Sequence, residues 1–338
     1  MSRNVRNALS LIAKLIFAAG VIYWMNASGK LDFHVVGRAF QQWPTALFLL
    51  FTMYLQIAII SWRWNVLNGA LGFGIRYVEA FSLSMIGLLF TVVIPGSVGG
   101  DVIKAYYVGM RVPNRRAHAF TTILMDRYLG MLSLLTVGAL GAVWNYRVVL
   151  ASKVMTSLAT VVVLAFLGFS LSLVIGVFFS KQVAGLLRRF EHRVAPVRHA
   201  AKMCEALEEF RAKPWVLLLG VLMSLPSHLI ACLGMHIAMG MVGAPDLPME
   251  RFLLAVPLGL ITTVIPITPG GVGIGQVAFL KLFDSLAPGT GQSAVNAFTV
   301  YQTLQLAVYL TGFVNYLSHR KVDPTDPTPQ AQAAEVTV

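Results

Sequence analysis

Two short stretches rich in proline and glycine interrupt apolar segments, and they carry groups suited to binding an anion. The first break covers residues 94–100, the second covers residues 265–271, and both contain the pattern P-x-x-x-G-G. Ser97 and Thr268 are predicted to cap the helices that follow them. A helix N-terminus presents free N–H groups and a partial positive charge, which suits a phosphate group. The breaks therefore predict two half-helices that begin in the membrane and face an anion.

The glycines of the breaks would let an anionic group approach the backbone closely. These residues are Gly99, Gly100, Gly270 and Gly271. For any single glycine, tight packing of the two helical arms is an equal alternative. The paired arrangement of the four favours an anion site.

Charged side chains gather near the first break in the sequence. Asp101 directly follows the break, Lys104 comes one helical turn later, and Asp126 and Arg127 lie within a later apolar segment. Ionisable residues at such depth are costly and usually functional. We expect Lys104, Arg111 and Arg127 to hold an anionic headgroup, and the two aspartates to orient these cations or carry a coupling proton. A structural ion pair between Asp101 and Arg127 is an even alternative.

Gln276 follows the second break, where it can hydrogen-bond a headgroup or satisfy core polarity. Two histidines, His228 and His236, share a face of one segment and suggest a proton relay, although ordinary hydrogen bonding to a carbonyl is the favoured reading. No H-E-x-x-H, C-x-x-C or Walker sequence occurs. We therefore expect a protein that is not an enzyme, with no catalytic residues, metal or cofactor.

The composition is that of a membrane protein. Of the 338 residues, 57% are hydrophobic and 12% are charged, against roughly 25% charged residues in a soluble domain. A membrane span needs about 20 mostly apolar residues. Six segments qualify, near residues 8–25, 44–62, 118–144, 154–179, 215–242 and 292–317, and the broken segments cover residues 78–110 and 251–286.

The distribution of the basic residues along the chain predicts the orientation of the protein in the membrane. The chain has 26 Lys and Arg against 14 Asp and Glu, a net charge of +12. With a cytoplasmic N-terminus, nineteen basic residues, Arg63 and Lys104 among them, fall inside and six fall outside. Since cytoplasmic loops collect Lys and Arg, nucleic acid is not an expected partner. We expect a multi-pass protein of the bacterial inner (cytoplasmic) membrane with both termini in the cytoplasm.

The two broken segments also form an internal repeat. They align without a gap at an offset of 171, so that Pro95 matches Pro266, while Pro44 and Pro214 open the preceding spans at an offset of 170. Each broken segment adds zero or two crossings, because it is either re-entrant or crosses twice. The spans opening at Pro44 and Pro214 then run in opposite senses, and the copies are inverted. Inverted repeats with broken helices near the midplane are typical of secondary transporters, with duplication for folding alone as the weaker alternative.

The predicted fold is an all-α polytopic membrane protein of about six full spans and two broken or re-entrant hairpins that meet near the bilayer midplane. A single transmembrane domain is expected over residues 1–320. Its repeats cover about residues 44–144 and 214–317, with a cytoplasmic amphipathic segment at 181–213 and a disordered tail at 321–338.

Three motifs together resemble those of a known family. They are Pro95 to Asp101 followed by Lys104-Ala105-Tyr106-Tyr107, then Asp126-Arg127-Tyr128-Leu129-Gly130, and Pro269-Gly270-Gly271-Val272-Gly273. They resemble the flippase-like transmembrane family, which includes the membrane half of lysylphosphatidylglycerol synthases, over about residues 8–318. The resemblance implies an inverted-repeat fold that moves a lipid headgroup between leaflets. The usual arginine after the first break is Lys104 here, and an acidic residue often found after the second break is Gln276.

The expected function is a lipid flippase or transporter that moves a phosphate-bearing envelope lipid, such as a phospholipid or polyprenyl-linked lipid, between leaflets. The expected partners are membrane lipids with an anionic headgroup. Two alternatives come from other classes. One is a scaffold that partners an envelope glycosyltransferase or lipid-modifying enzyme, and the other is an intramembrane enzyme acting on lipid phosphates. Lipid aminoacylation is not expected from this chain alone, because the soluble aminoacyltransferase domain of the long synthases would need hundreds more residues after the last span.

Overall fold

The computed structural model describes residues 32–93, 99–188, 207–264 and 271–319, together with Gly20, Tyr23, Asn26 and Ala27. These residues form helices joined by short turns, and no strand occurs among them. The predicted all-α class is therefore confirmed. Within the described residues, four segments are long and apolar enough to cross a membrane, namely Trp43–Ala70, Pro113–Trp144, Lys153–Phe178 and Pro214–Met241.

These four segments contain the helices α3 (Trp43–Ala70), α6 (Arg116–Trp144), α8 (Lys153–Phe178) and α11 (Pro214–Met241). A further long helix, α14 (Gly291–His319), carries more polar side chains. The expected span at 8–25 except Gly20 and Tyr23, the tail at 321–338 and most of the segment at 181–213 lie outside the described residues. The remaining helices are α2 (Phe33–Ala39), η1 (Pro113–Arg115), α7 (Tyr146–Ala151) and α9 (Ser180–Arg188).

The first broken segment forms α4 (Tyr77–Val93) and α5 (Gly99–Arg111), and the second forms α12 (Met249–Val264) and α13 (Ile274–Leu286). Helices α5 and α13 have 13 residues each, or about 20 Å at 1.5 Å per residue. This length is short of the hydrocarbon core, which is about 30 Å thick.

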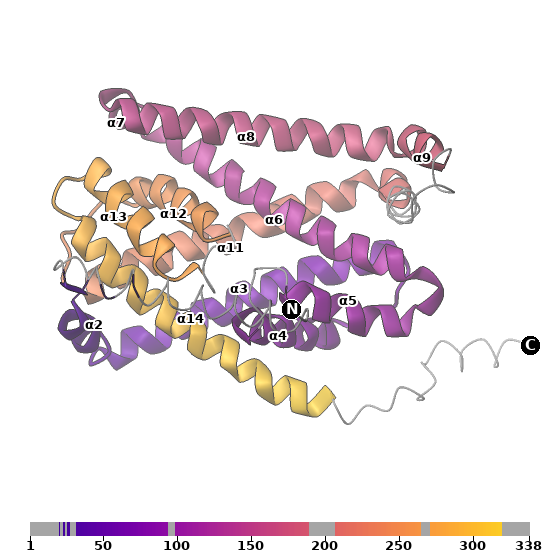
Figure 1. The fold of residues 1–338 in the computed structure, drawn as a ribbon, viewed down its shortest axis with the longest axis horizontal. Helices are drawn as coiled ribbons and strands as arrows, with labels where there is room; N and C mark the ends of the chain where they lie inside the picture. Colours follow the sequence, from indigo (N-terminus) through magenta and orange to yellow (C-terminus); the bar gives the residue numbers. More distant parts are fainter. Residues whose placement is uncertain are drawn as a thin grey trace, which may run out of the picture.

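One end of the molecule, which we call the Arg115 end, is defined by two side chains that bind helix termini. Arg115 donates to the Leu71 carbonyl at 2.8 Å, and Lys213 donates to the Ala70 carbonyl at 2.9 Å. The end of α3 and the starts of α6 and α11 therefore lie together. Helix α4 begins shortly after α3 and α5 ends shortly before α6, so the first hairpin both starts and ends here (Figure 1).

The opposite end, the Asn145 end, is defined in the same way. The Asn145 amide donates to the Glu250 carbonyl at 2.6 Å, and the Gln42 amide donates to the Met241 carbonyl at 3.0 Å. The end of α6, the start of α12, the start of α3 and the end of α11 therefore meet. Helix α13 ends just before α14 begins, on this same side of the molecule (Figure 1). The two broken segments thus enter the protein from opposite ends.

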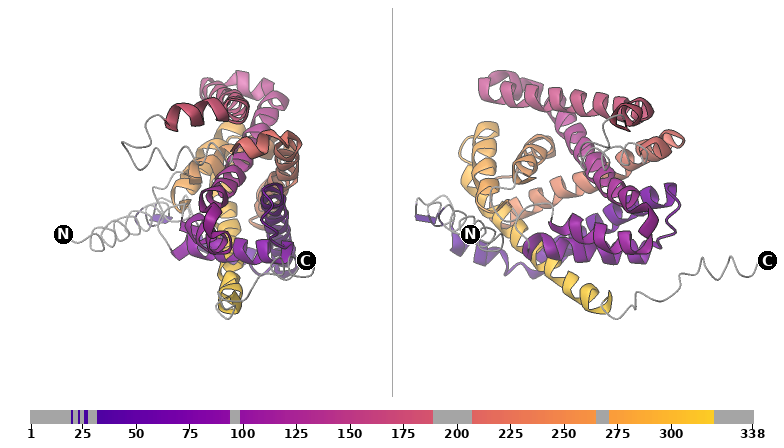
Figure 2. Two further views of the ribbon diagram at one scale, coloured as in Figure 1. Left: turned by 90° about the vertical axis from the view of Figure 1, so that its right-hand side faces the viewer. Right: turned by 45° about the vertical axis from the view of Figure 1, so that its right-hand side comes forward.

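Helix lengths recur along the chain in the same order. Helices α3, α4, α5 and α6 have 28, 17, 13 and 29 residues, and α11, α12, α13 and α14 have 28, 16, 13 and 29. The packing recurs too, because α4 packs on α14 while α12 packs on α6, and α3 packs on α11. Helix α8 lies along one side of this set and packs chiefly against α6 (Figures 1 and 2).

Glycines allow the two crossed contacts to form at backbone distance. A Cβ at Gly312 of α14 would collide with the backbone of Met85 in α4, and a Cβ at Gly141 of α6 would collide with the backbone of Leu253 in α12. Small residues at such crossings let helix backbones approach closely in membranes. The backbone oxygens cannot move aside without shifting a helix.

We expect Gly141→Val and Gly312→Val each to destabilise the fold by about 1–3 kcal/mol through overpacking. Gly168→Val in α8 is the matched control, because a Cβ there meets nothing within 4 Å. Unfolding in detergent, followed by circular dichroism, measures the difference. Equal stability of all three variants would contradict the close packing.

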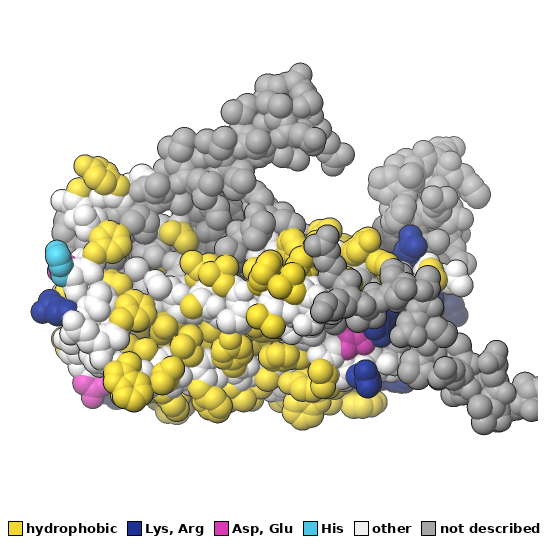
Figure 3. All heavy atoms as spheres, turned by 90° about the horizontal axis from the view of Figure 1, so that it is seen from below, with side chains coloured by type: hydrophobic (Ala, Val, Ile, Leu, Met, Phe, Trp, Pro, Cys, Tyr) yellow, Lys and Arg dark blue, Asp and Glu magenta, His cyan; other side chains and the backbone are white. Residues whose placement is uncertain are grey.

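The surface between the two ends is apolar. In Figure 3, hydrophobic side chains cover the described part of one face, and coloured charged side chains gather toward its two ends. Exposed large residues on this surface belong to several helices, with Phe51 at 62%, Leu140 at 60% and Leu164 at 62% exposure. Such a surface fits lipid tails, as expected for a protein that lies in a bilayer.

Candidate functional site

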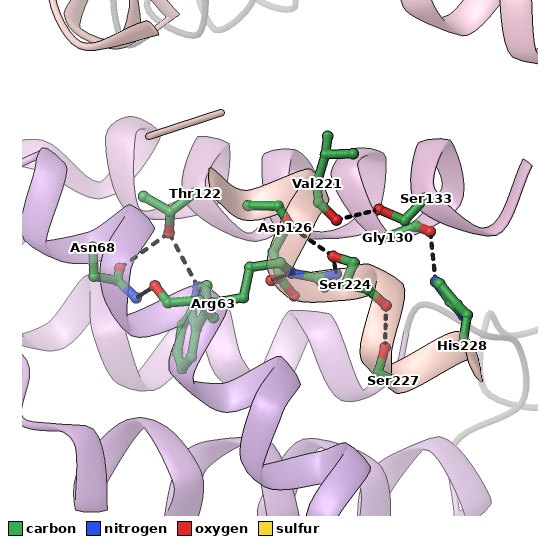
Figure 4. A network of polar contacts seen from close by, with 12 residues as sticks. Arg63, Asn68, Thr122, Asp126, Gly130, Ser133, Val221, Ser224, Ser227 and His228 are labelled. Carbon is green, nitrogen blue, oxygen red and sulfur yellow. Dashed lines mark hydrogen bonds and ion pairs between the residues drawn. The ribbon is translucent and has the colours of Figure 1, made fainter. Parts of the chain in front are cut away.

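A buried ion pair joins three of the long helices. Arg63 of α3 donates through Nε to Asp126 of α6 at 2.7 Å, and both side chains are under one-tenth exposed, at 5% and 7%. The Arg63 Nη1 atom also bonds to the Ser224 hydroxyl of α11 (Figure 4). Ser224 in turn donates to the Gly220 carbonyl. The pair therefore connects both halves of the chain.

Two glycines, which lack side chains, leave space for the Arg63 side chain. A Cβ at Gly130 of α6 would lie 3.2 Å from its Nη1 atom, and a Cβ at Gly220 of α11 would lie 3.8 Å from the Arg63 stem. The Gly130 carbonyl bonds to His228 Nε2 at 3.0 Å (Figure 4). His228 thus has the carbonyl partner favoured from the sequence, while His236 contacts Asp246 at 3.2 Å.

A second ion pair lies at the start of α5. Arg127 of α6 contacts Asp101 with Nε–Oδ2 at 2.7 Å and Nη2–Oδ1 at 3.0 Å, which is a two-bond arrangement. The Arg127 side chain is 50% exposed, and that of Asp101 is 14% exposed. The ion pair that the sequence left as an alternative is thus present. Unlike the Arg63–Asp126 pair, it is open on one side.

Lys104 lies between the two ion pairs. It is 8% exposed, and its Nζ atom sits 4.1 Å from the centroid of the fully buried Trp64 ring. Its electrostatic neighbours are Asp126, Asp101, Arg127 and Arg63. Within the described ranges its ammonium group has no hydrogen-bond or ion-pair partner, so a cation–π contact is its closest interaction. A buried cation without a bonded anion is costly in a protein interior.

The five charged residues form a cluster with a surplus positive charge. Arg63, Lys104 and Arg127 supply three cations, and Asp101 and Asp126 supply two carboxylates. Asp126 lies ten residues into α6, or about 15 Å from the Arg115 end. The cluster therefore has a net charge of about +1 within the span region, and it can accept one anionic group.

The structure separates the other predicted residues from this cluster. Arg111 pairs with Glu79 at 2.8 Å and closes the base of the first hairpin. It lies ten residues beyond Asp101 on α5, or about 15 Å away. Gly100 fits tight packing, because a Cβ there would collide with the Gly87 carbonyl, and Gly99 is buried beside it.

The start of the second half-helix differs from its predicted position. Helix α13 begins at Ile274 with Gly273 as its N-cap, so Thr268 does not cap it. Gly271 and Gly273 have φ angles of +71° and +88°, which turn the chain before the helix starts. Ser97, Thr268 and Gly270 themselves lie outside the described residues.

Gln276 closes this turn from inside. It is 1% exposed, accepts a hydrogen bond from the Gly273 N–H at 2.7 Å and donates to Gln302 Oε1 of α14 at 2.9 Å. A Cβ at Gly271 would collide with Thr263, so this glycine is required for packing. The second hairpin thus presents neutral, bonded groups where the first presents charged ones.

Sequence reasoning missed Arg63 and Trp64. The apolar stretch at 44–62 predicts that Arg63 lies on the cytoplasmic side, together with Lys104. Helix α3 continues to Ala70 and buries Arg63 at 4% and Trp64 at 0% exposure. The signal that was available is the unpaired acid Asp126 within a span, which requires a cation from another helix.

The fold and the charged cluster define a multi-pass α-helical integral membrane protein with ionic groups held inside its helices. The chain matches the family described as the lysylphosphatidylglycerol synthase TM region over residues 11–312, and it belongs to this family, whose members are tied to lipid handling. A curated relative, a UPF0104 membrane protein of Methanothermobacter thermautotrophicus, is 24% identical over 274 residues, which cover 74% of this chain and 78% of the relative. No solved structure matches the chain.

Proposed function

We propose that this protein moves an anionic, phosphate-bearing lipid between the two leaflets of the cytoplasmic membrane. The observation that carries the proposal is the buried Lys104 ammonium, which lies beside a tryptophan ring and has no ion-pair partner among the described residues. A lipid phosphate near Lys104 and Arg127 would neutralise the surplus charge of the cluster. The family's link to lipid handling supports a lipid as the source of that phosphate.

The proposed path starts at the Arg115 end. Arg127 is half-exposed beside Asp101, so an anionic headgroup can reach it without a rearrangement of the buried Arg63–Asp126 pair. Lys104 lies one turn further along α5, on the Arg115 side of Asp101, so the same headgroup can lie near both Lys104 and Arg127. The acyl chains stay in the bilayer, because their contact with the apolar outer surface of the protein has no free-energy cost.

We also propose that the two halves are inverted copies with re-entrant hairpins. Helices α3 and α11 run in opposite senses between the two ends, and both hairpins return to the end from which they start. The arms of about 20 Å are too short to cross the core alone. Basic residues favour a cytoplasmic Arg115 end, among them Arg76, Arg111, Arg115, Arg116, Lys181, Arg211 and Lys213.

Transport is tested in vesicles that contain the purified protein and a trace of fluorescent phosphatidylglycerol or phosphatidylcholine. Chemical quenching of the outer leaflet follows the transfer of each lipid. We expect the wild type to transfer phosphatidylglycerol faster, and Lys104→Met to lower that rate by about tenfold or more, because methionine keeps the apolar stem but removes the buried charge.

Lys281→Met is the matched control, since Lys281 is an exposed residue of α13 far from the cluster. It should leave the rate unchanged. Equal rates for wild type and Lys104→Met would contradict the assigned site. A wild type that transfers neither lipid would favour the scaffold, and a new lipid product detected by mass spectrometry would favour the enzyme.

A further inference from the structure

Equivalent positions in the two halves make equivalent contacts with different chemistry. Helices α5 and α6 correspond to α13 and α14 at an offset of 175 residues, judged from their first residues and equal lengths. At this offset Asp101 corresponds to Gln276, and Arg127 corresponds to Gln302. The first two side chains bind each other at 2.7 Å and the second two at 2.9 Å. An ion pair in one half is thus a neutral hydrogen bond in the other.

The offset is four residues larger than the gapless alignment of the breaks. The reason is the pair of positive-φ glycines, Gly271 and Gly273, which delay the start of α13 by about one helical turn. The contacts, rather than the sequence identities, therefore define which side chains correspond.

A second correspondence supports the first. The Lys104 stem packs at 3.1 Å from the Cβ position of Gly87 in α4, and the Phe279 ring packs against the Cβ position of Gly259 in α12. Lys104 and Phe279 are again 175 residues apart, and the two glycines are 172 apart. A buried cation in the first half is therefore a buried aromatic ring in the second.

The buried ion pair follows the same rule. Asp126 corresponds to Tyr301 at the offset of 175, and Arg63 of α3 corresponds to Gly234 of α11 at an offset of 171. The Tyr301 ring packs against the Cβ position of Gly234, as Asp126 contacts Arg63. Every charged member of the cluster thus has an uncharged counterpart.

The two equivalent pairs also differ in exposure. Arg127 is 50% exposed, while Gln276 is 1% exposed and Gln302 is half-buried. The charged pair is therefore more exposed than the neutral pair in the same structure. In an inverted repeat, the alternative state exchanges the conformations of the halves. That state would bury the charged pair and open the neutral one.

We propose that this charge asymmetry holds the empty protein open toward the Arg115 end, and that an anionic ligand releases it. Burial of a cluster with surplus positive charge is unfavourable, whereas a neutral hydrogen-bonded pair is buried at little cost. A bound anion neutralises the surplus and lowers the cost of closure. The inference rests on the proposed function for the identity of the ligand, but the bias of the empty protein does not require transport.

The test measures distances between spin labels at equivalent positions in both halves. One pair, Met110 of α5 and Ser318 of α14, spans the Arg115 end. The second pair, Val143 of α6 and Ser285 of α13, spans the Asn145 end. Each label replaces a residue by cysteine in a Cys204→Ala and Cys232→Ala background. The protein is placed in nanodiscs of phosphatidylcholine, with phosphatidylglycerol as the added anionic lipid.

The decisive variant is Asp101→Asn with Arg127→Gln and Lys104→Met, which makes the first pair as neutral as the second and removes the surplus positive charge of the cluster. We expect the fraction closed at the Arg115 end to rise by about tenfold without any anionic lipid, and added phosphatidylglycerol to shift the wild type in the same direction. The control is Glu79→Gln with Arg111→Gln, which neutralises the ion pair at the base of the same hairpin. It should leave the distances unchanged.

A reverse variant keeps the inference open to refutation if the neutral pair perturbs folding. Gln276→Glu with Gln302→Arg places an ion pair in the second half, and the glutamate keeps the oxygen that accepts from Gly273. It should raise the fraction open at the Asn145 end. Unchanged distances in both folded variants would overturn the inference even if lipid transfer occurs. A shift without lipid transfer would retain the bias and remove the proposed function.

Discussion

Replacement of Asp126 by Ala is expected to lower the free energy of unfolding by about 3–5 kcal/mol, because it leaves the Arg63 guanidinium buried without its carboxylate. Both side chains are under one-tenth exposed, so neither water nor lipid headgroups can compensate the charge. Ser224 would remain as a neutral partner and cannot replace the lost charge. Unfolding of purified protein in mixed micelles, followed by circular dichroism, measures the loss.

The double variant Arg63→Met with Asp126→Leu separates the charge from the packing. It removes both charges and keeps apolar volume, so it should recover a large part of the stability lost in Asp126→Ala. A double variant that is less stable than the single one would show that Arg63 contributes chiefly through its packing against Gly130 and Gly220.

Arg127→Gln is expected to slow transfer of phosphatidylglycerol by about tenfold or more, because it removes the exposed cation of the cluster and its surplus charge. The fold should change little. The Arg127 side chain is half-exposed, so we expect a smaller loss of stability than in Asp126→Ala, where both partners are buried. The vesicle assay and the unfolding experiment together separate the two effects.

Arg127→Lys is the conservative comparison. It keeps the charge but loses the two-bond contact with Asp101, so we expect an intermediate transfer rate. A fully active Arg127→Gln variant would remove Arg127 from the site. A variant that fails to fold would instead show that the Asp101–Arg127 pair is structural, as the Arg63–Asp126 pair is.

The sequence predicted the positions of the helices well because length and hydropathy alone determine which segments suit a bilayer. The expected spans near 118–144, 154–179 and 215–242 each lie within two residues of the observed helix bounds. The breaks were found because proline and glycine interrupt a helix in any environment. These are local properties of the chain, and they do not depend on partners.

The ionic partners were harder to predict, since a partner depends on how helices are rotated against each other. Asp101 and Arg127 were considered together because few charges occur near the breaks. Arg63 was assigned to a loop because it follows the apolar stretch, although α3 carries it inward. The register of α13 was missed by one turn, because glycines with positive φ can lengthen a break without leaving a trace in hydropathy.

The position of helix α8 between the two halves bears on how the chain could have arisen by duplication. The unit from α3 to α6 contains two crossing helices and a hairpin that returns to its own side, so it begins and ends on the same face of the membrane. A tandem duplication of such a unit would give two copies with the same orientation. In the inverted-repeat arrangement that we propose, α8 adds one crossing between the two copies and reverses the second. Four of its 26 residues are buried, namely Met155, Ala159, Val162 and Val177, which fits a helix retained to reverse the second copy rather than for packing.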